Sequence, residues 1–282
     1  MAAAVFYALN VPCSKLLLQD VAPTYMAAFL YLGAGLGVGF LYIFRHFRRC
    51  KEKQSQRLSR KDLPYTVGMV LLDIIAPILL MTGVKLGTSA NASLLGNFEI
   101  VATTVIALLL FREKVSCRLW GAIGLITLSS MILSFDGKDS FSFSVGSLFV
   151  LSATVCWGLE NNCTRSISGK STYQIVTIKG FGSGTGALCV ALFLCETPPD
   201  LKKIPAVLLL GFVAYGLSIF TYIRAQKTLG AARTSAYYAV APFIGAFLSF
   251  LMLKESLTAS YAVALVVMIA GTALTVSMKH TE

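Results

Sequence analysis

Four ionisable side chains interrupt the apolar runs of this sequence. Asp73, Glu99, Glu160 and Lys179 each lie within a long stretch of mainly apolar residues. A charge at the centre of a bilayer costs about 3 kcal/mol on insertion scales, so such residues persist mainly where they are paired or functional. These four side chains are therefore the first candidates for chemistry.

Glu99 belongs to a broad polar stripe with helical spacing. The stripe consists of Ala92, Gly96, Glu99 and Thr103, with Ser93, Asn97 and Thr104 beside them. Two interpretations stay open: the stripe lines a substrate cavity that includes Asn97 and Glu99, or it is a helix-packing face with hydrogen-bonding side chains. Because a carboxylate without water favours its neutral form, Glu99 is also a candidate for proton coupling.

Glu160 stands on a second polar face, and a similar face lies near the N-terminus. The second face is Trp157, Glu160, Asn161 and Thr164, and the N-terminal one is Tyr7, Asn10 and Ser14. Each has an aromatic residue about one turn before its polar group. We expect Tyr7, Asn10, Trp157, Glu160 and Asn161 to line one central substrate site, with Glu160 a second proton-coupling candidate. The alternative for Glu160 is a polar contact near the cytoplasmic end of its helix.

Asp73 and Lys179 have less specific surroundings. Asp73 precedes Pro77 by four residues, so it either binds substrate or a proton, or satisfies backbone groups that the proline leaves unpaired. Lys179 lies nearer the start of its apolar run, and we expect its ammonium group to extend along the helix to the membrane surface.

Tyrosines mark two later apolar runs. Tyr215 and Tyr238 complete the predicted substrate site, because aromatic rings suit planar solutes and bind cations through the ring face. Tyrosines at the membrane interface are the alternative, which fits Tyr222 best. Glu113 and Glu255 follow the ends of long apolar runs and are expected to be structural.

Metal and cofactor chemistry has little support in the sequence. The seven cysteines form no C-x-x-C pair, and the two histidines, His46 and His280, stand near the charged ends of apolar runs. Zinc sites and disulfide frameworks require other spacings, so we expect neither, and we expect no cofactor.

The elements that must position these residues are transmembrane helices. Hydrophobic residues make up 56% of the 282 residues and charged residues 13%, about half the usual share of a soluble domain. Continuous helices satisfy every backbone group in lipid. The sequence predicts an all-α integral membrane protein with ten spans, at residues 2–18, 24–44, 64–84, 88–111, 116–134, 145–165, 172–195, 204–223, 231–253 and 259–278.

The distribution of positive charge predicts the orientation. Eight of the 24 Lys and Arg lie between Arg45 and Lys61, a loop between two apolar runs. With both termini in the cytoplasm, 17 basic residues lie inside and six outside, in agreement with the positive-inside rule. We expect residues 48–61 inside and residues 136–142 outside a cell membrane such as the bacterial plasma membrane. The net charge of +11 is thereby explained without a nucleic-acid partner.

An internal repeat divides the chain. Residues 7–15 align without a gap to residues 157–165, and Lys85-Leu86-Gly87 matches Thr228-Leu229-Gly230 further along. The predicted repeats are residues 1–137 and 138–282. Because five spans is an odd number, the two halves enter the membrane in opposite orientations, as in many secondary transporters.

The chain also resembles the EamA domains of the drug/metabolite transporter superfamily, once in each half. The matching pieces are the aromatic-Gly/Ala-Leu opening of each half, a Leu-Gly followed by small and polar residues, and an apolar span that closes on Glu113 or Glu255. The family often has Glu-Pro in the fourth span of a half. Here Glu99 is followed by Ile100 and Pro242 is preceded by Ala241, so that role cannot be transferred intact.

The resemblance implies a secondary transporter that exports amino acids or similar small metabolites by alternating access. Exporters of organic cations or drugs form the alternative within the same class. An intramembrane lipid-modifying enzyme and a channel or scaffold are hypotheses from other classes. No G-x-x-x-x-G-K-[ST] motif is present, so we expect no ATP hydrolysis. The expected partners are a small-molecule substrate and the lipid bilayer, and the oligomeric state stays open, with a monomer among the options.

Overall fold

The computed structural model describes residues 1–47, 57–111, 117–134, 144–229, 238–255 and 258–277, and within them every regular element is a helix. The predicted all-α class is confirmed. The elements are α1 (Ala2–Ala8), α2 (Asn10–Leu17), α3 (Pro23–Phe47), η1 (Arg60–Asp62), α4 (Leu63–Leu86), α5 (Ser89–Leu95), α6 (Phe98–Phe111), α7 (Cys117–Ser134), α8 (Val145–Ile167), α9 (Thr172–Phe193), α10 (Ile204–Gly211), η2 (Phe212–Leu217), α11 (Ser218–Leu229), α13 (Ala241–Leu253) and α14 (Ala259–Ser277).

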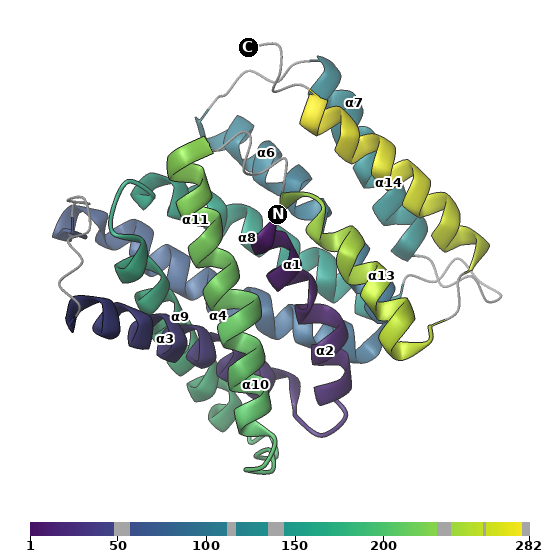
Figure 1. The fold of residues 1–282 in the computed structure, drawn as a ribbon. Helices are drawn as coiled ribbons and strands as arrows, with labels where there is room; N and C mark the ends of the chain where they lie inside the picture. Colours follow the sequence, from purple (N-terminus) through teal and green to yellow (C-terminus); the bar gives the residue numbers. More distant parts are fainter. Residues whose placement is uncertain (48–56, 112–116, 135–143, 230–237, 256–257, 278–282) are drawn as a thin grey trace.

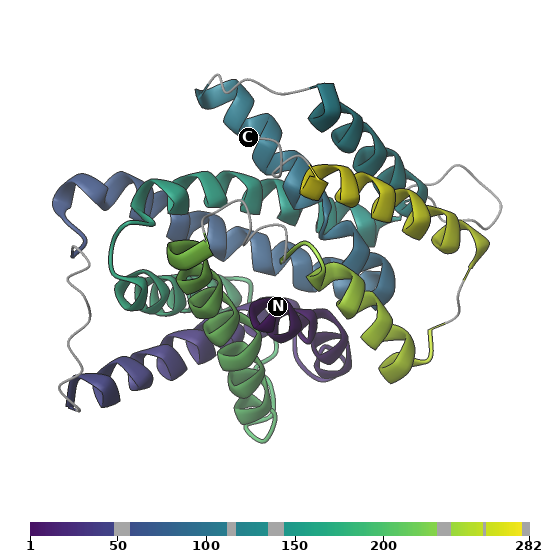
Figure 2. The same cartoon turned by 45° about the horizontal axis from the view of Figure 1, so that its top comes forward.

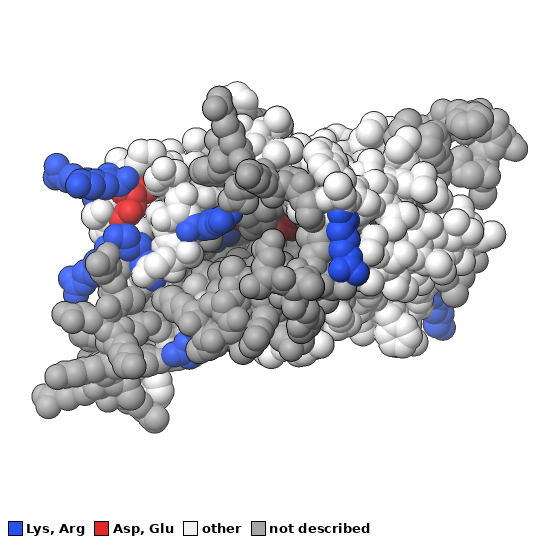
Figure 3. Space-filling model, turned by 90° about the horizontal axis from the view of Figure 1, so that it is seen from above, with Lys and Arg blue, Asp and Glu red and all other residues white. Residues whose placement is uncertain are grey.

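Many of these helices have the length and composition of membrane spans. Within the described residues, six helical stretches are long and apolar enough to cross a membrane, and three shorter apolar helices accompany them. The six are Pro23–Phe44, Arg60–Leu86, Ser89–Leu109, Cys117–Ser134, Thr172–Phe193 and Ile204–Ala225. Large apolar side chains cover the outside: Phe40 and Leu109 in these stretches, and Val266 in α14, are strongly exposed. In Figure 3 the described surface is mostly uncharged, and several Lys and Arg side chains gather toward the left end. Such a surface suits lipid contact.

Three helical stretches are discontinuous. α1 and α2 separate at Leu9, near Pro12, and α5 and α6 separate at Gly96 and Asn97. Between α10 and α11 the chain takes the wider π-helical form in η2, which contains Tyr215. Breaks of this kind often mark binding sites, because they free backbone groups and redirect side chains.

The helices pack in pairs that are distant in sequence. α3 contacts α9, α4 contacts α8, and α7 contacts α14. The pair of α7 and α14 lies at one edge of the bundle in both views (Figures 1 and 2). At the α3–α9 crossing, a Cβ atom on Gly180 would stand 2.4 Å from Cα of Gly35. Only glycine therefore permits this close backbone approach.

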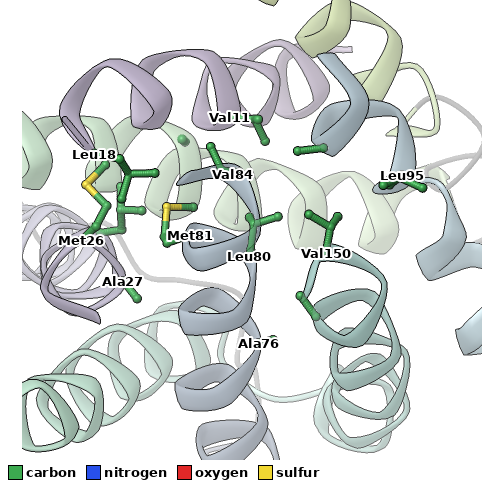
Figure 4. Packing of buried hydrophobic residues seen from close by; sticks show 14 of the residues in the cluster. Val11, Leu18, Met26, Ala27, Ala76, Leu80, Met81, Val84, Leu95 and Val150 are labelled. Carbon is green, nitrogen blue, oxygen red and sulfur yellow. The ribbon is translucent and has the colours of Figure 1, made fainter. Parts of the chain in front are cut away.

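A continuous hydrophobic core fills the space between these helices. Figure 4 shows side chains of α2, α3, α4, α5 and α8 converging on it, among them Val11, Met26, Leu80, Leu95 and Val150. All five are buried. The core fixes the helices that carry the polar groups described below.

Polar contacts tie the helix ends on one side of the molecule. The Lys15 ammonium group donates to the carbonyl oxygens of Val84 and Gly87, each at 2.7 Å. The Glu255 carboxylate accepts from the backbone N–H groups of Ser89 and Ala90, at 2.7 and 2.8 Å. The first two N–H groups of α5 are thus paired, which agrees with the structural role expected for Glu255. Glu113 lies outside the described residues.

Candidate functional site

A buried ion cluster joins α4, α8 and α9, which lie side by side (Figure 1). The Lys179 ammonium nitrogen is 2.9 Å from Oε1 of Glu160 and 3.2 Å from Oδ2 of Asp73. The side chains of Lys179, Glu160 and Asp73 are exposed by only 8%, 3% and 0%. Charges removed from water in this way are stable only when they are paired.

Lys179 therefore does not extend to the membrane surface, and the prediction that it does was wrong. The attraction of two carboxylates from neighbouring helices outweighs hydration at the surface, and the side chain stays inside. Two interpretations of Asp73 were open: that it binds substrate or a proton, or that it pairs with backbone groups near Pro77. Its contacts are with the side chains of Lys179 and Tyr31 on other helices. Glu160 also accepts a hydrogen bond from the Thr164 hydroxyl, one turn along α8.

Tyr31 connects the ion cluster to the N-terminal helices. Its hydroxyl donates to Oδ1 of Asp73 at 2.8 Å, and its ring lies 4.9 Å from the ring of Tyr215. The Tyr215 hydroxyl in turn accepts from Nδ2 of Asn10 at 3.0 Å, and the Ser14 hydroxyl donates to Oδ1 of Asn10. Asn10, predicted from its repeat partner Glu160, is fully buried in this chain of contacts.

Tyr31 was not predicted as a site residue. It lies in an apolar run with no polar neighbour at helical spacing, so no local pattern sets it apart. The packing of α3 against α4 brings it to Asp73, and the packing of α3 against η2 brings it to Tyr215.

Glu99 forms a second polar contact with α8. The Asn161 side-chain amide donates to Oε1 of Glu99 at 2.6 Å and to the Thr103 hydroxyl at 3.3 Å. Asn161 follows Glu160 directly in the chain, so the Glu99 contact and the ion cluster are adjacent along α8. Glu99 itself is half-buried.

Aromatic rings surround the Asn10–Tyr215 contact. The Tyr7 ring lies 6.1 Å from that of Tyr215 and 5.8 Å from that of Tyr238. The Tyr222 ring lies 4.9 Å from that of Tyr238 and so adjoins this cluster, and the membrane-interface interpretation of Tyr222 stays a prediction. Ser218 contacts the Tyr238 hydroxyl at 3.4 Å and donates to the carbonyl oxygen of Ala3.

Two predicted residues stand apart from these contacts. Trp157 is buried in the hydrophobic core one turn before Glu160. Asn97, at the break between α5 and α6, is 2% exposed, and neither polar atom of its amide has a hydrogen-bond partner in the described part of the chain. The Ser93 hydroxyl, one turn earlier, is likewise unpartnered there. Buried polar atoms without partners are rare, and a ligand is one explanation for them.

The arrangement can bind a charged or zwitterionic molecule inside the membrane domain. Three carboxylates, one ammonium group and a group of tyrosines occur along helices that lipid surrounds. Within the described ranges, no cluster of three or more His, Cys, Asp or Glu is placed to hold a metal ion. Such a polar interior in an apolar helical bundle is typical of membrane transporters.

Comparison with known proteins gives the particular family. The sequence profile of the EamA-like transporter family matches residues 1–135 and again residues 144–277. The chain belongs to the EamA-like transporter family, and the resemblance seen in the sequence is confirmed.

Curated relatives agree with this assignment, and a solved structure shares the fold. An uncharacterized transporter of Methanothermobacter thermautotrophicus is 25% identical over 95% of this chain and 82% of its own length. The uncharacterized transporter YyaM of Bacillus subtilis is 22% identical over 61% of this chain and 59% of its own length. A crystal structure covers 98% of the chain and is itself covered to 94%, with a TM-score of 0.70 and 15% identity, so it shares the fold. The protein is thus a membrane transporter rather than an enzyme.

Proposed function

We propose that this protein is a secondary transporter that exports amino acids or similar small metabolites by alternating access. The observation that carries the proposal is that the polar contacts cross between the two halves of the chain. Asn10 bonds Tyr215, Asp73 pairs with Lys179, and Glu99 bonds Asn161. A substrate bound among these groups would contact both halves at once, so relative movement of the halves can expose it to either side.

The proposal includes ten spans arranged as two inverted repeats, residues 1–137 and 138–282. Helix contacts support it. The matched helices α1 and α8 each pack against two helices of the opposite half: α1 contacts α11 and α13, and α8 contacts α4 and α6. Glycine positions agree. A Cβ on Gly158 would lie 2.8 Å from Cβ of Ala102, and one on Gly245 would lie 3.2 Å from the carbonyl oxygen of Ala8. Ala8 and Gly158 are matched positions in the repeat.

The orientation in the proposal places both termini in the cytoplasm of a cell membrane. Contacts between loops support the grouping of the charges. Lys170 pairs with Asp62 at 3.5 Å, which brings the basic segments 57–62 and 165–170 together. The lysines assigned to the outside form a separate group. Lys15 donates to the carbonyl oxygen of Lys85, and Lys254 directly precedes Glu255, which accepts from the start of α5.

Substrate would bind among Tyr7, Asn10, Asn97, Glu99, Trp157, Glu160, Asn161, Tyr215 and Tyr238, and protons would be carried by Glu99, Glu160 or Asp73. The tyrosines and the excess of carboxylates over ammonium groups also favour a second candidate within the class, export of organic cations or drugs.

Flux in proteoliposomes tests the function. Purified protein, reconstituted with unlabelled substrate inside, should accelerate uptake of the same labelled substrate, because a carrier exchanges substrate across the membrane. A channel gives no such acceleration, and an enzyme alters the compound chemically. Screening amino acids and amines in this assay, with and without a pH gradient, identifies the cargo and its coupling. Absence of exchange for every compound, with correctly folded protein, would overturn the proposal.

A further inference from the structure

The Lys179 cluster contains more carboxyl groups than ammonium groups. Two carboxyl groups, those of Asp73 and Glu160, face one ammonium group. Glu99 adds a third nearby, because it accepts a hydrogen bond from Asn161, the residue after Glu160. Among the described residues, Lys179 is the one Lys or Arg that is buried. When Asp73 and Glu160 are both ionised, Lys179 balances only one of the two charges, and a buried site with uncompensated negative charge attracts a cation.

One oxygen of the cluster has unused hydrogen-bonding capacity. Oδ1 of Asp73 accepts from Tyr31 at 2.8 Å, whereas Oδ2 lies 3.2 Å from the Lys179 ammonium nitrogen. Asp73 is fully buried. Because an ionised carboxylate accepts about four hydrogen bonds, the pairing with Lys179 leaves Asp73 incompletely satisfied. A better-oriented donor could replace the lysine at this oxygen.

The Lys179 ammonium group can leave Asp73 by movement of the lysine side chain alone. The backbone of α9 is held against α3 at the Gly180–Gly35 crossing, directly after Lys179. Four methylene groups and several rotatable bonds nonetheless let a lysine ammonium group move by several ångströms without helix movement. Tyr31 contacts the other oxygen of Asp73, Oδ1, and its ring lies 4.9 Å from that of Tyr215. Aromatic rings beside a carboxylate suit an organic cation.

We propose that Lys179 is a built-in counter-cation that occupies the place of the positively charged group of the cargo. The cargo is then a molecule with an ammonium group, either an amine or the amino group of a zwitterion, which displaces Lys179 from Asp73 and Glu160. This inference rests on the proposed transport function and specifies its substrate class.

Displacement can be measured on the unaltered protein. The probe is N,N-dimethyl-2-phenylethylamine, which is cationic at neutral pH and cannot be acetylated. Acetic anhydride then modifies accessible lysines, and mass spectrometry gives the modified fraction of each. We expect acetylation of Lys179 to rise severalfold with the amine and to stay unchanged with its neutral counterpart N,N-dimethyl-2-phenylacetamide. Exposed Lys61 serves as the internal reference.

Variants test the competition directly. Lys179→Met combined with Asp73→Asn removes the internal cation and keeps the Glu160 carboxylate, so the amine should bind at least about tenfold tighter, or about 1.4 kcal/mol. Lys179→Arg keeps a competing cation and should not tighten binding. Asp73→Asn combined with Glu160→Gln should abolish amine binding.

The inference is overturned if Lys179 stays protected with the amine bound, if the amine does not bind, or if the Met variant binds it no tighter than the unaltered protein. The proposed function fails separately, when the unaltered protein exchanges no cargo in vesicles. Exchange of cargo without any effect of the amine on Lys179 would therefore reject this inference and leave the transporter in place.

Discussion

At the residue scale, the interior of this transporter is held by charges whose energies depend on each other. Removing one partner from a buried ion pair leaves an uncompensated charge, which typically costs about 3–5 kcal/mol. The Asp73–Lys179–Glu160 cluster therefore stabilises the contacts among α4, α8 and α9 while its charges stay paired. A substrate or proton that enters it must replace the interactions it breaks.

Single residues were predictable where their type conflicted with their surroundings. Asp73, Glu99 and Glu160 were identified as charges in apolar runs, and Asn10 through the repeat. The direction in which Lys179 points was not predictable, because it depends on carboxylates 106 and 19 positions away in the chain. Tyr31 was missed for the same reason: its polar contact is entirely tertiary.

Glu99→Gln tests proton coupling. Glutamine retains the carbonyl oxygen that accepts from Asn161, so the variant should fold like the unaltered protein. It cannot release a proton, so pH-driven flux should disappear while exchange down a substrate gradient remains. Flux with and without a pH gradient measures this.

The matched control is Asp20→Asn, an exposed acid paired with Lys203 at a helix end, which should leave pH-driven flux unchanged. Normal pH-driven flux in Glu99→Gln would assign Glu99 to packing, and Glu160 or Asp73 would be the remaining candidates.

At the element scale, broken helices and close crossings position the site. Asn10 begins α2 after one break, Asn97 lies in another, and Tyr215 lies in η2. Hydropathy located these stretches as helices because apolar composition and length suffice for that. It did not locate their breaks, since apolar residues continue through Leu9 and through Phe212 to Leu217 and only backbone geometry distinguishes them.

Gly180→Ala should destabilise the protein by about 1–3 kcal/mol or more, because the new methyl group meets the α3 backbone and has no room to move. Thermal unfolding in detergent checks this. Gly124→Ala in α7 is the control, with no atom within 4 Å of the added carbon, and should be neutral or stabilising. Equal stability of both variants would mean that α3 and α9 are not in close contact.

Glu255→Ala should lower stability by about 1–2 kcal/mol, since two N–H groups at the start of α5 lose a charged acceptor. Glu255→Gln keeps one acceptor oxygen and should lose less. Thermal unfolding of the three proteins gives the order. If alanine and glutamine are both neutral, water replaces the carboxylate and the contact contributes nothing to stability.

At the scale of the whole molecule, the topology was argued from charge alone. Residues 48–61 are predicted inside and residues 136–142 outside, and positions 48–56 and 136–142 lie outside the described residues. Gln54→Cys and Lys138→Cys, in a background without the seven native cysteines, test it. An impermeant thiol reagent on intact cells should label position 138 and spare position 54. The reverse labelling pattern would show that the protein has the opposite orientation in the membrane.

The most direct test of the central claim is exchange of labelled cargo in proteoliposomes by the unaltered protein and by Glu160→Gln. We predict saturable exchange of an amino acid or amine by the unaltered protein. Glu160→Gln should fold but lose most of this exchange, because the Lys179 pairing and the charge of the site change together. Asp200→Asn, an exposed acid outside the bundle, should exchange normally. Full exchange by Glu160→Gln, or none by folded unaltered protein, would contradict the claim that this charged interior carries substrate.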